Sequence, residues 1–556
     1  MRTQFSHETR KWNLQRMTEE SVDLLVIGGG ITGAGIAWDA ALRGLRVALV
    51  EQHDFASGTS SRSTKLIHGG LRYLAQGEIN LVREVGQERA ILHRLAGHVV
   101  HPTLLLLPIY KGGQYGWWGT MVGLWLYDRL AKVKKSERRL MLDKSATLQR
   151  EGRLQQDGLR GGGLYVEYRT DDARLTMEVM KSAHEAGALI AHYAKVTELA
   201  YDENGQVCGA EVQDLLEDRK LTVKATVVVN AAGPWVDVVR KYEGELSGKR
   251  LHLTKGVHLT VSRERLPLSH AVYIGTDDGR MVFVIPRGTK TYIGTTDTNY
   301  EGPIHKPVCS REDAEYLLRA VNHHFPGMEL VLTDVESSWA GLRPLLHEDG
   351  KSPSELSRKE EIFKSDSGLY SMAGGKLTGF RKMAEKMVDR VVADMQSREP
   401  GRSFRGIATG VTTISGGMLG AEGFEPFQNE MVKQGARYGL EREVVETLVQ
   451  RYGSNVRQIF GYLDQDLAQK VRIGGPLPVI RAEVTYAVEQ EMTVTLTDFL
   501  LRRTGDLLFA AEQALAGAPR LLEEFAMQLG WDDAERERQM RLWDDAVQQA
   551  RGFLAE

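Results

Sequence analysis

A glycine-rich segment near the start of the chain has the spacing of a dinucleotide-binding turn. Gly28, Gly30 and Gly33 form a GxGxxG pattern directly after the apolar run 22–27. The first glycine permits a tight turn, the second lets a pyrophosphate approach the backbone, and the third lets a helix pack on the strand. Glu51 ends the next apolar run, where a carboxylate can accept hydrogen bonds from an adenosine ribose. A turn without a ligand is the alternative reading. The glycine pattern and Glu51 together indicate a binding site for FAD or NAD and argue against NADP.

Two later segments of small residues favour FAD over NAD. VVVNAAG at 227–233 has the pattern of a buried strand that ends in a small-residue turn. MAGGKLT at 372–378 again joins a short strand, a double glycine and a helix start, and that helix N-terminus would face electron-rich flavin oxygens. An ordinary strand end is the alternative for the first segment. FAD is long and extended, so backbone turns that are far apart in the sequence can approach the same molecule. We therefore expect FAD as the cofactor.

Other chemistry-bearing residues narrow the class of protein. The segment 57–74 is too polar and glycine-rich for a core element and too rich in hydrogen-bond donors for a simple linker. The histidine pairs 98/101 and 323/324 fit neither an HExxH nor a Cys/His ligand pattern, so we expect no metal site. The chain lacks a GxSxG nucleophile and a Walker loop, which argues against hydrolase and P-loop chemistry.

Hydrophobic periodicity predicts the elements that position these motifs. A strand at 22–27, a helix at 31–43 and a strand at 45–50 form a βαβ unit. Further β-like runs lie at 103–107, 225–229, 282–285 and 292–293, which favours an α/β or α+β architecture. From about residue 401 the apolar residues recur at helical spacing, and the stretch 397–406 is the best linker candidate.

Charge and composition exclude several functions. The 71 Lys and Arg residues against 74 Asp and Glu leave a net charge of −3, which argues against a protein that binds nucleic acid through bulk charge. Two distant cysteines form no disulfide framework and fit a reducing compartment. The first 20 residues contain no apolar core for a signal peptide. We expect a cytoplasmic protein with at most peripheral contact at the inner face of the cell membrane.

Several motifs together are similar to those of one enzyme family. The sequence resembles the FAD-dependent glycerol-3-phosphate dehydrogenases, which belong to the D-amino-acid-oxidase-like flavoprotein superfamily. The resemblance spans about residues 22–504 and rests on IGGGITGAGIAWDAALRGLRVALVE, TSSRSTKLIHGGLRYL, VVVNAAGPWVD, AGLRPL, MAGGKLTGFRKMAE and EVTYAVEQEMTVTLTDFLLRRT. Many flavoproteins share the first segment, whereas IHGGLRYL and the last phrase are far more restrictive.

The resemblance implies a fold with three parts. These are a Rossmann-like α/β FAD-binding domain of the glutathione-reductase or D-amino-acid-oxidase type, an α+β substrate domain with a mixed or antiparallel sheet, and a C-terminal all-α domain. We expect an N-terminal extension at 1–20 and a discontinuous FAD-binding domain within 21–395, made of about 21–80, 150–255 and 345–395. The inserted substrate domain then covers about 81–149 and 256–344, and the helical domain covers 405–556.

The resemblance also implies roles for individual residues. Arg72 and Arg343 match substrate-binding arginines, whose guanidinium groups suit phosphate oxygens. His258 is the favoured base for the hydroxyl proton, since an imidazole can hold a pKa near the working pH, and Tyr73 is the backup. Lys376 serves substrate or flavin. The alternative is that the arginines and Lys376 form ordinary ion pairs and that His258 is a packed side chain without a catalytic role. The expected cofactor-binding residues are Gly28, Gly29, Gly30, Thr32, Gly33, Glu51, Thr59, Ser60, Ser61, Lys65, Leu66, His68, Ala232, Gly233, Gly375, Lys376, Leu377 and Thr378.

The expected reaction is oxidation of sn-glycerol 3-phosphate to dihydroxyacetone phosphate by hydride transfer to FAD. A second Rossmann fingerprint is not visible, and the resemblance implies a membrane quinone as the electron acceptor. The aromatic stretch 115–127 and the basic run 132–139 would suit an anionic bilayer surface, with a buried helix as the alternative. The competing functions are a glycerophosphate oxidase that uses oxygen, an amine or amino-acid oxidase, and a non-catalytic flavin-binding protein. A homodimer is left open.

Overall fold

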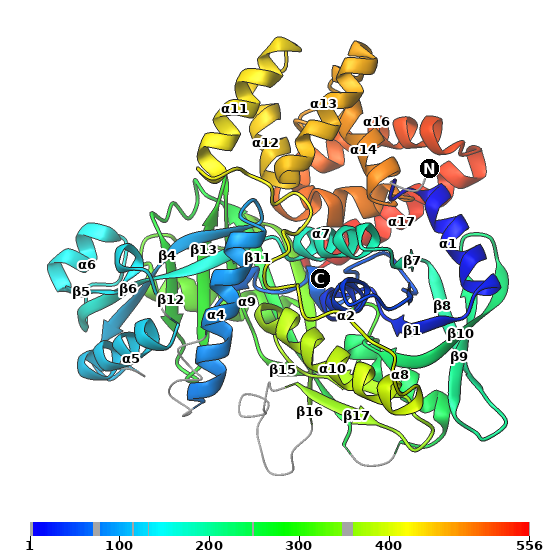
Figure 1. Cartoon of the computed structure of the whole chain (residues 1–556). Helices are drawn as coiled ribbons and strands as arrows, with labels where there is room; N and C mark the ends of the chain where they lie inside the picture. The colour runs from blue at the N-terminus through cyan, green and yellow to red at the C-terminus, as the bar shows by residue number, and fades with distance from the viewer. Residues whose placement is uncertain are drawn as a thin grey trace.

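The computed structural model describes residues 4–69, 78–113, 116–131, 133–246, 249–346 and 360–554 of the 556-residue chain. These residues form two sheets with the helices that cover them and a separate group of C-terminal helices (Figure 1). The helices coloured yellow to red lie together above the two sheets in that view. The expected helical tail is therefore present as its own layer.

The first sheet is mainly parallel and includes the glycine turn. Its strand order is β17-β18-β10-β1-β2-β7, and only β17 on this path is antiparallel to its neighbour. The predicted βαβ unit is confirmed as β1, α2 and β2. The bounds are β1 Val22–Ile27, β2 Val47–Val50, β7 Leu189–Ala191, β10 Arg219–Asn230, β17 Glu361–Lys364 and β18 Tyr370–Ala373.

Both faces of this sheet are covered. Helices α2 (Ile31–Leu42), α7 (Asp172–Glu185) and α10 (Phe380–Arg398) pack on one face. The other face is covered by α1 and by β8 and β9, which continue from β10 as an antiparallel extension. All residues of β1 are buried, which explains its continuous apolar run. The bounds of the covering elements are α1 His7–Glu19, β8 Ala194–Tyr201 and β9 Val207–Asp214.

The second sheet is mixed and mostly antiparallel. Its order is β15-β11-β14-β13-β12-β4-β6-β3, with β16 paired to β11 and β5 paired to β6, and β12 runs parallel to β4. The strands are β3 Leu66–Ile67, β4 Val100–Tyr110, β5 Leu140–Asp143, β6 Leu159–Thr170, β11 Leu251–Ser262, β12 Ala271–Gly275, β13 Met281–Arg287, β14 Lys290–Gly294, β15 Thr298–Asn299 and β16 Val335–Leu346. The associated helices are α4 Ile79–Leu95, α5 Trp117–Leu130, α6 Lys144–Arg150 and α9 Arg311–His324. The short helix α8 (Val236–Arg240) instead contacts β10 and β18 of the first sheet.

The C-terminal helices build their own apolar cores and then dock on both sheets. Ser337 Oγ and Ser338 Oγ, on β16, donate hydrogen bonds to the carbonyls of Leu508 and Ala550 at 2.6 and 3.0 Å. A π-helical segment at Asp498–Arg503 carries two buried arginines. The helices are α11 Phe424–Arg437, α12 Arg442–Tyr452, α13 Val456–Gln465, α14 Arg481–Gln490, α15 Asp506–Phe509, α16 Ala511–Leu529 and α17 Asp533–Arg551.

Two stretches pair in ways that the expected domain bounds do not describe. Strand β6 lies within 150–255, which the expected bounds place in the FAD-binding domain, but it pairs with β4 and β5 in the second sheet. Within the expected N-terminal extension, α1 packs against β7, and the Arg10 guanidinium forms a buried ion pair with Asp214 at 2.5 Å. The three-part division itself stays a proposal.

Candidate cofactor and active site

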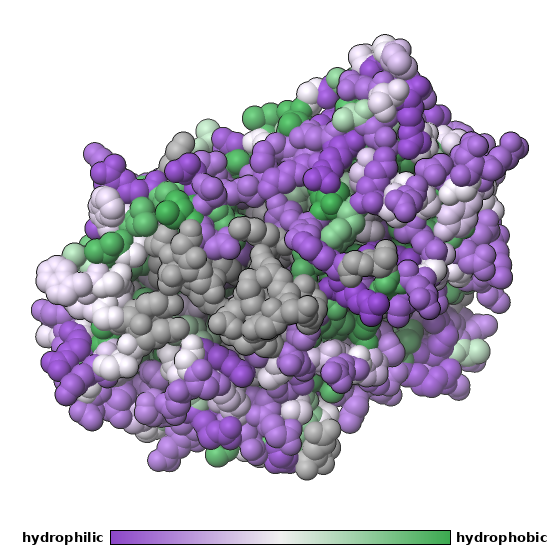
Figure 2. All heavy atoms as spheres, turned by 90° about the horizontal axis from the view of Figure 1, so that it is seen from below, coloured by the Kyte–Doolittle hydropathy of each residue, from purple (hydrophilic) through white to green (hydrophobic). Residues whose placement is uncertain are grey.

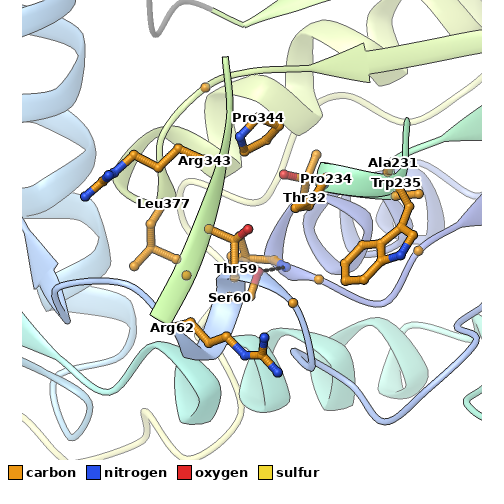
Figure 3. A pocket seen from close by; sticks show the side chains of 18 of the residues that line it. Thr32, Thr59, Ser60, Arg62, Ala231, Pro234, Trp235, Arg343, Pro344 and Leu377 are labelled. Atoms are coloured by element: carbon orange, nitrogen blue, oxygen red, sulfur yellow. Dashed lines mark hydrogen bonds between the residues drawn. The ribbon is translucent and has the colours of Figure 1, made fainter. Parts of the chain in front are cut away.

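A cavity lies where the carboxyl ends of β1, β2, β10 and β18 meet, and residues of β11 and β16 line it from the second sheet. Carboxyl ends of parallel strands are the usual ligand position in open α/β sheets. Figure 3 shows Thr32, Thr59 and Ser60 close together, with Trp235 on one side of them and Leu377 and Arg343 on the other. The cavity thus joins the cofactor motifs to the candidate substrate residues.

The glycine turn leaves the start of α2 open toward this cavity. Helix α2 begins after Gly30, which has no side chain to cap the helix, and the Ile31 N–H donates to Ser60 Oγ at 3.0 Å. A Cβ on Gly33 would lie 1.9 Å from the Gly28 carbonyl oxygen, so only glycine allows the helix to pack this closely on the turn. The N-terminus of a helix attracts anions, and this one borders the cavity without a capping side chain at Gly30, which fits a pyrophosphate.

The Glu51 carboxylate sits at the end of β2 beside this turn. Its Oε2 accepts a hydrogen bond from the Gly29 N–H at 2.6 Å, and its Oε1 accepts one from the His53 N–H at 2.8 Å. Burial raises the pKa of the Glu51 carboxyl, and the backbone N–H groups oppose that rise by stabilising the charged form. Glu51 also lines the cavity, so its remaining lone pairs can accept ribose hydroxyls.

The two later small-residue turns reach the same cavity. After β10, Ala232 and Gly233 line it, and the Asn230 amide stabilises this turn by donating to the Val236 carbonyl at 2.9 Å. After β18, the segment 374–378 lines it as well. Three turns from strands far apart in the sequence therefore converge as a long cofactor requires, and the residues present fit FAD.

His258 lies in β11 and is buried. Its Nε2 is 2.9 Å from Thr64 Oγ1, and its ring stacks on the Trp339 indole. Nδ1 has no hydrogen-bond partner among the residues that the structure describes. Burial, followed by the charges of Arg343 and Lys65, lowers the pKa of His258 well below its ordinary value. The imidazole is therefore neutral near pH 7 and able to accept a proton.

Arg343 projects from β16 and is about one-fifth exposed. Its Nη1 donates to Asp297 Oδ1 at 3.1 Å, and its Nη2 donates to Thr295 Oγ1 at 3.1 Å. Both terminal nitrogens also donate to the Thr296 carbonyl. The guanidinium thus lines the cavity while Asp297 partly balances its charge.

The structure brings most of the predicted site residues together. The predicted residues that line the cavity are Gly28, Gly30, Thr32, Glu51, Thr59, Ser60, Leu66, His68, Ala232, Gly233, His258, Arg343, Gly375, Lys376, Leu377 and Thr378. Gly29, Gly33, Ser61 and Lys65 do not line it. Arg72 and Tyr73 lie outside the described residues.

Lys65, which was expected to contact the cofactor, forms a buried ion pair in the structure. Its ammonium donates to Asp172 Oδ1 at 2.5 Å and to the Ser61 carbonyl at 3.0 Å, and the side chains of Lys65 and Asp172 are buried. Asp172 Oδ2 also accepts hydrogen bonds from Ser63. The lysine therefore secures the segment that carries the site residues instead of lining the cavity.

Sequence reasoning missed several lining residues. Arg62 lines the cavity, and burial together with the nearby charge of Arg502 lowers its pKa to about 10. Trp235 also lines it, and Thr64 does so while contacting His258. Arg62 and Thr64 lie inside the polar segment 57–74, so its unusual composition was the available signal.

One buried group has the residue types of a metal site. Atoms of Asp54, His192 and Asp498 lie within 4.8 Å of one another. The Asp54 carboxylate is already paired with Arg502 and Arg503, whose positive charges repel a cation. The group is therefore better explained as an ionic contact between parts of the chain.

The fold and the cavity define an FAD-dependent oxidoreductase. Residues 23–381 match the family described as FAD dependent oxidoreductase, and residues 411–536 match the C-terminal domain of alpha-glycerophosphate oxidase. These matches confirm the expected cofactor, the α/β FAD-binding fold and the helical C-terminal domain.

Near full-length relatives identify the family more closely. A Bacillus subtilis (strain 168) protein named aerobic glycerol-3-phosphate dehydrogenase is 48% identical over 98% of this chain and 99% of its own length. A Staphylococcus haemolyticus protein of the same name is also 48% identical, over 98% of this chain and 97% of its own length. The crystal structure of the Bacillus halodurans glycerol-3-phosphate dehydrogenase complexed with FAD matches with a TM-score of 0.84 at 43% identity, over 98% of each chain. The chain belongs to the aerobic glycerol-3-phosphate dehydrogenase family.

Proposed function

We propose that this enzyme oxidises sn-glycerol 3-phosphate to dihydroxyacetone phosphate. One observation carries the proposal: the cavity that three glycine-rich turns line on the cofactor side is lined by His258 and Arg343 on the other. The names of the 48% identical relatives support the same substrate. When bound, FAD supplies a flavin that accepts the hydride from the alcohol carbon.

His258 takes the proton from the substrate hydroxyl. Its lowered pKa keeps the imidazole neutral and available as a base, and the stacked Trp339 ring holds it in one plane. Thr64 Oγ1 bonds to Nε2 and restricts rotation of the ring. The positive charge of Arg343, which helps to lower this pKa, also favours the negative oxygen that forms as the proton leaves.

Arg343 binds the phosphate end of the substrate. A guanidinium fork matches phosphate oxygens, but the terminal nitrogens of Arg343 already donate to Asp297, Thr295 and Thr296. Phosphate binding therefore exchanges part of these contacts for stronger ones. Lys376 lines the cavity from the third turn and adds positive charge. We expect Arg72 to contribute a second guanidinium and Tyr73 to line the substrate.

We propose a membrane quinone as the electron acceptor. No helix among the described residues is both long and apolar enough to cross a bilayer, so contact with the quinone pool would occur at the surface. Oxygen is the second candidate, because residues 411–536 match the C-terminal domain of alpha-glycerophosphate oxidase. Reoxidation of the substrate-reduced enzyme by a quinone analogue without peroxide formation supports the first, and stoichiometric peroxide supports the second.

Helix α5 provides the surface for that contact. Trp118, Val122 and Trp125 are 72%, 55% and 46% exposed. Figure 2 shows hydrophobic side chains interrupting the hydrophilic surface on the side where Figure 1 places α5. Interfacial tryptophans beside cations suit an anionic membrane surface. The alternative of a fully buried helix does not fit these exposures.

Anaerobic reduction of the flavin tests the substrate directly. Addition of glycerol 3-phosphate to the purified holoenzyme under nitrogen should bleach the visible absorbance of the oxidised flavin. Glycine and proline serve as matched additions, because amino-acid oxidation is the competing chemistry. Bleaching by an amino acid and not by glycerol 3-phosphate would overturn the proposal.

A further inference from the structure

The loop after β2, residues 52–58, lies between the glycine turn and the C-terminal helices. None of the chemistry proposed above uses the C-terminal phrase that ends in Arg502 and Arg503, although both arginines reach this loop. We propose that Arg502 and Arg503 act as positioning residues for FAD by holding Asp54, and with it the loop, against the glycine turn.

On the side of the C-terminal helices, the loop is held by a buried ionic cluster. The Arg503 guanidinium donates to both oxygens of Asp54, at 2.7 and 2.8 Å, and Arg502 Nε contacts the same carboxylate. Arg502 Nη2 also donates to Asp498 Oδ1 at 2.6 Å. Burial alone would raise the pKa of Asp54, but Arg503 and Arg502 hold it well below its ordinary value. The carboxylate therefore stays charged and paired.

The local backbone explains how two consecutive arginines reach one carboxylate. They end the π-helical segment 498–503, and such segments occur often at functional sites. Arg503 also donates to the Glu491 carbonyl at 2.9 Å, which ties its side chain to the end of α14. Contacts within the C-terminal region therefore hold both arginines in addition to their contacts with Asp54.

On its other side, the loop contacts the glycine turn. Phe55 follows Asp54 directly, and a Cβ on Gly29 would lie 3.0 Å from its ring. The Ala56 N–H donates to the Gly29 carbonyl at 3.0 Å. The Phe55 ring stacks on His192 at 4.9 Å, and His192 Nε2 is 2.7 Å from the Met492 carbonyl oxygen. A shift of Asp54 is therefore transmitted to the pyrophosphate site within two residues.

Loss of one partner would move the loop for an electrostatic reason. A buried charge that loses its partner is strongly unfavourable, so the chain rearranges to reach water or another partner. Residues 57 and 58 at the end of the loop and residues 59 and 60 directly after it line the cavity, and Ser60 Oγ accepts a hydrogen bond from the Ile31 N–H at the start of α2. The expected consequence is weaker FAD binding, with the substrate groups His258 and Arg343 unaffected.

The test measures FAD dissociation from the full-length holoenzyme by the rise in flavin fluorescence on dilution. Asp54→Asn and Arg503→Gln should each raise the FAD dissociation constant about tenfold or more, whereas Arg503→Lys, which keeps the charge, should show a smaller rise. At saturating FAD, the KM for glycerol 3-phosphate should stay within about twofold of the unmodified enzyme.

Glu483→Gln is the matched control. Glu483 is buried and pairs with Arg451 at 2.9 Å within the C-terminal helices, away from the loop. It should lower the thermal unfolding midpoint as Asp54→Asn does but leave FAD binding unchanged. The proposal is overturned if Asp54→Asn and Glu483→Gln have equal FAD affinities. If Asp54→Asn does not fold, equal affinities of Arg503→Gln and Arg503→Lys overturn it.

Discussion

The imidazole of His258 lies parallel to the indole of Trp339, with ring centroids 4.8 Å apart and an interplanar angle of 8°. The two residues are directly opposite each other in the register of β11 and β16. On the other side of β11, His258 faces Gly294 of β14. The orientation of the candidate base is therefore set by residues from two neighbouring strands.

Gly294→Ala should displace this imidazole. A Cβ at position 294 would lie 2.0 Å from Cδ2 of His258, so the ring has to move away from Thr64 and Trp339. We expect kcat to fall about a hundredfold, the scale of a lost general base, with FAD content unchanged. Gly275→Ala in β12 is the control, because its nearest contact would be a flexible methionine sulfur at 3.7 Å. Steady-state kinetics with unchanged kcat for Gly294→Ala would contradict the role of His258.

The pH profile should report the lowered pKa of His258. Because burial, Arg343 and Lys65 keep the imidazole neutral, kcat/KM should stay level as the pH falls through 6.5 and decline only at more acidic pH. Arg343→Met removes one of these causes and should move the acid limb to higher pH. The free energy of unfolding should also fall on acidification. Near pH 6.5 the imidazole of the unfolded chain binds a proton while that of the folded chain does not, so acid favours the unfolded state. An acid limb at or above pH 6.5 in the unmodified enzyme would argue against His258.

Sequence patterns predicted the site best where neighbours in the chain are neighbours in space. The βαβ unit, the glycine turn and Glu51 form one local unit, so their spacing was sufficient. The pairing of Lys65 with Asp172 and of Asp54 with Arg503 joins positions more than 100 and more than 400 residues apart. No local pattern encodes such pairs, so the partner of Lys65 could not be predicted from the sequence. The register that places Trp339 and Gly294 around His258 was likewise not predictable from one sequence.

Arg343→Lys should weaken substrate binding. A lysine keeps the charge but cannot reproduce the guanidinium fork, and the loss of a charge-assisted hydrogen bond costs about 2 kcal/mol. We expect the KM for glycerol 3-phosphate to rise about tenfold or more while the FAD dissociation constant is unchanged. Inorganic phosphate, tested as a competitive inhibitor, should lose affinity in parallel. A KM equal to that of the unmodified enzyme would remove Arg343 from the phosphate site.

Glu51→Gln should weaken FAD binding by disturbing the glycine turn. The Gly29 N–H now donates to a carboxylate oxygen at 2.6 Å, and an amide is a weaker acceptor that also presents an N–H₂ group. A loss of about 1 to 2 kcal/mol corresponds to roughly a tenfold or greater rise in the FAD dissociation constant. Glu361→Gln, which removes an exposed ion pair with Lys249, is the control and should leave FAD binding unchanged. Equal affinities of the two variants would exclude the proposed ribose contact.

Replacement of the exposed tryptophans on α5 should reduce membrane binding. Trp118 and Trp125 share one face of the helix with Val122, and the Arg129 guanidinium lies 5.5 Å from the Trp125 ring centre, which places a cation beside the apolar side chains. The double variant Trp118→Ser and Trp125→Ser should lose most co-sedimentation with vesicles rich in anionic lipid and keep its activity with a soluble electron acceptor.

Trp12→Ser is the matched control, because Trp12 is 39% exposed on α1, on the opposite side of the molecule in Figure 1. Raised salt should weaken binding of the unmodified enzyme, since part of the attraction is electrostatic. Equal sedimentation of the double variant and the unmodified enzyme would show that α5 is not the membrane surface.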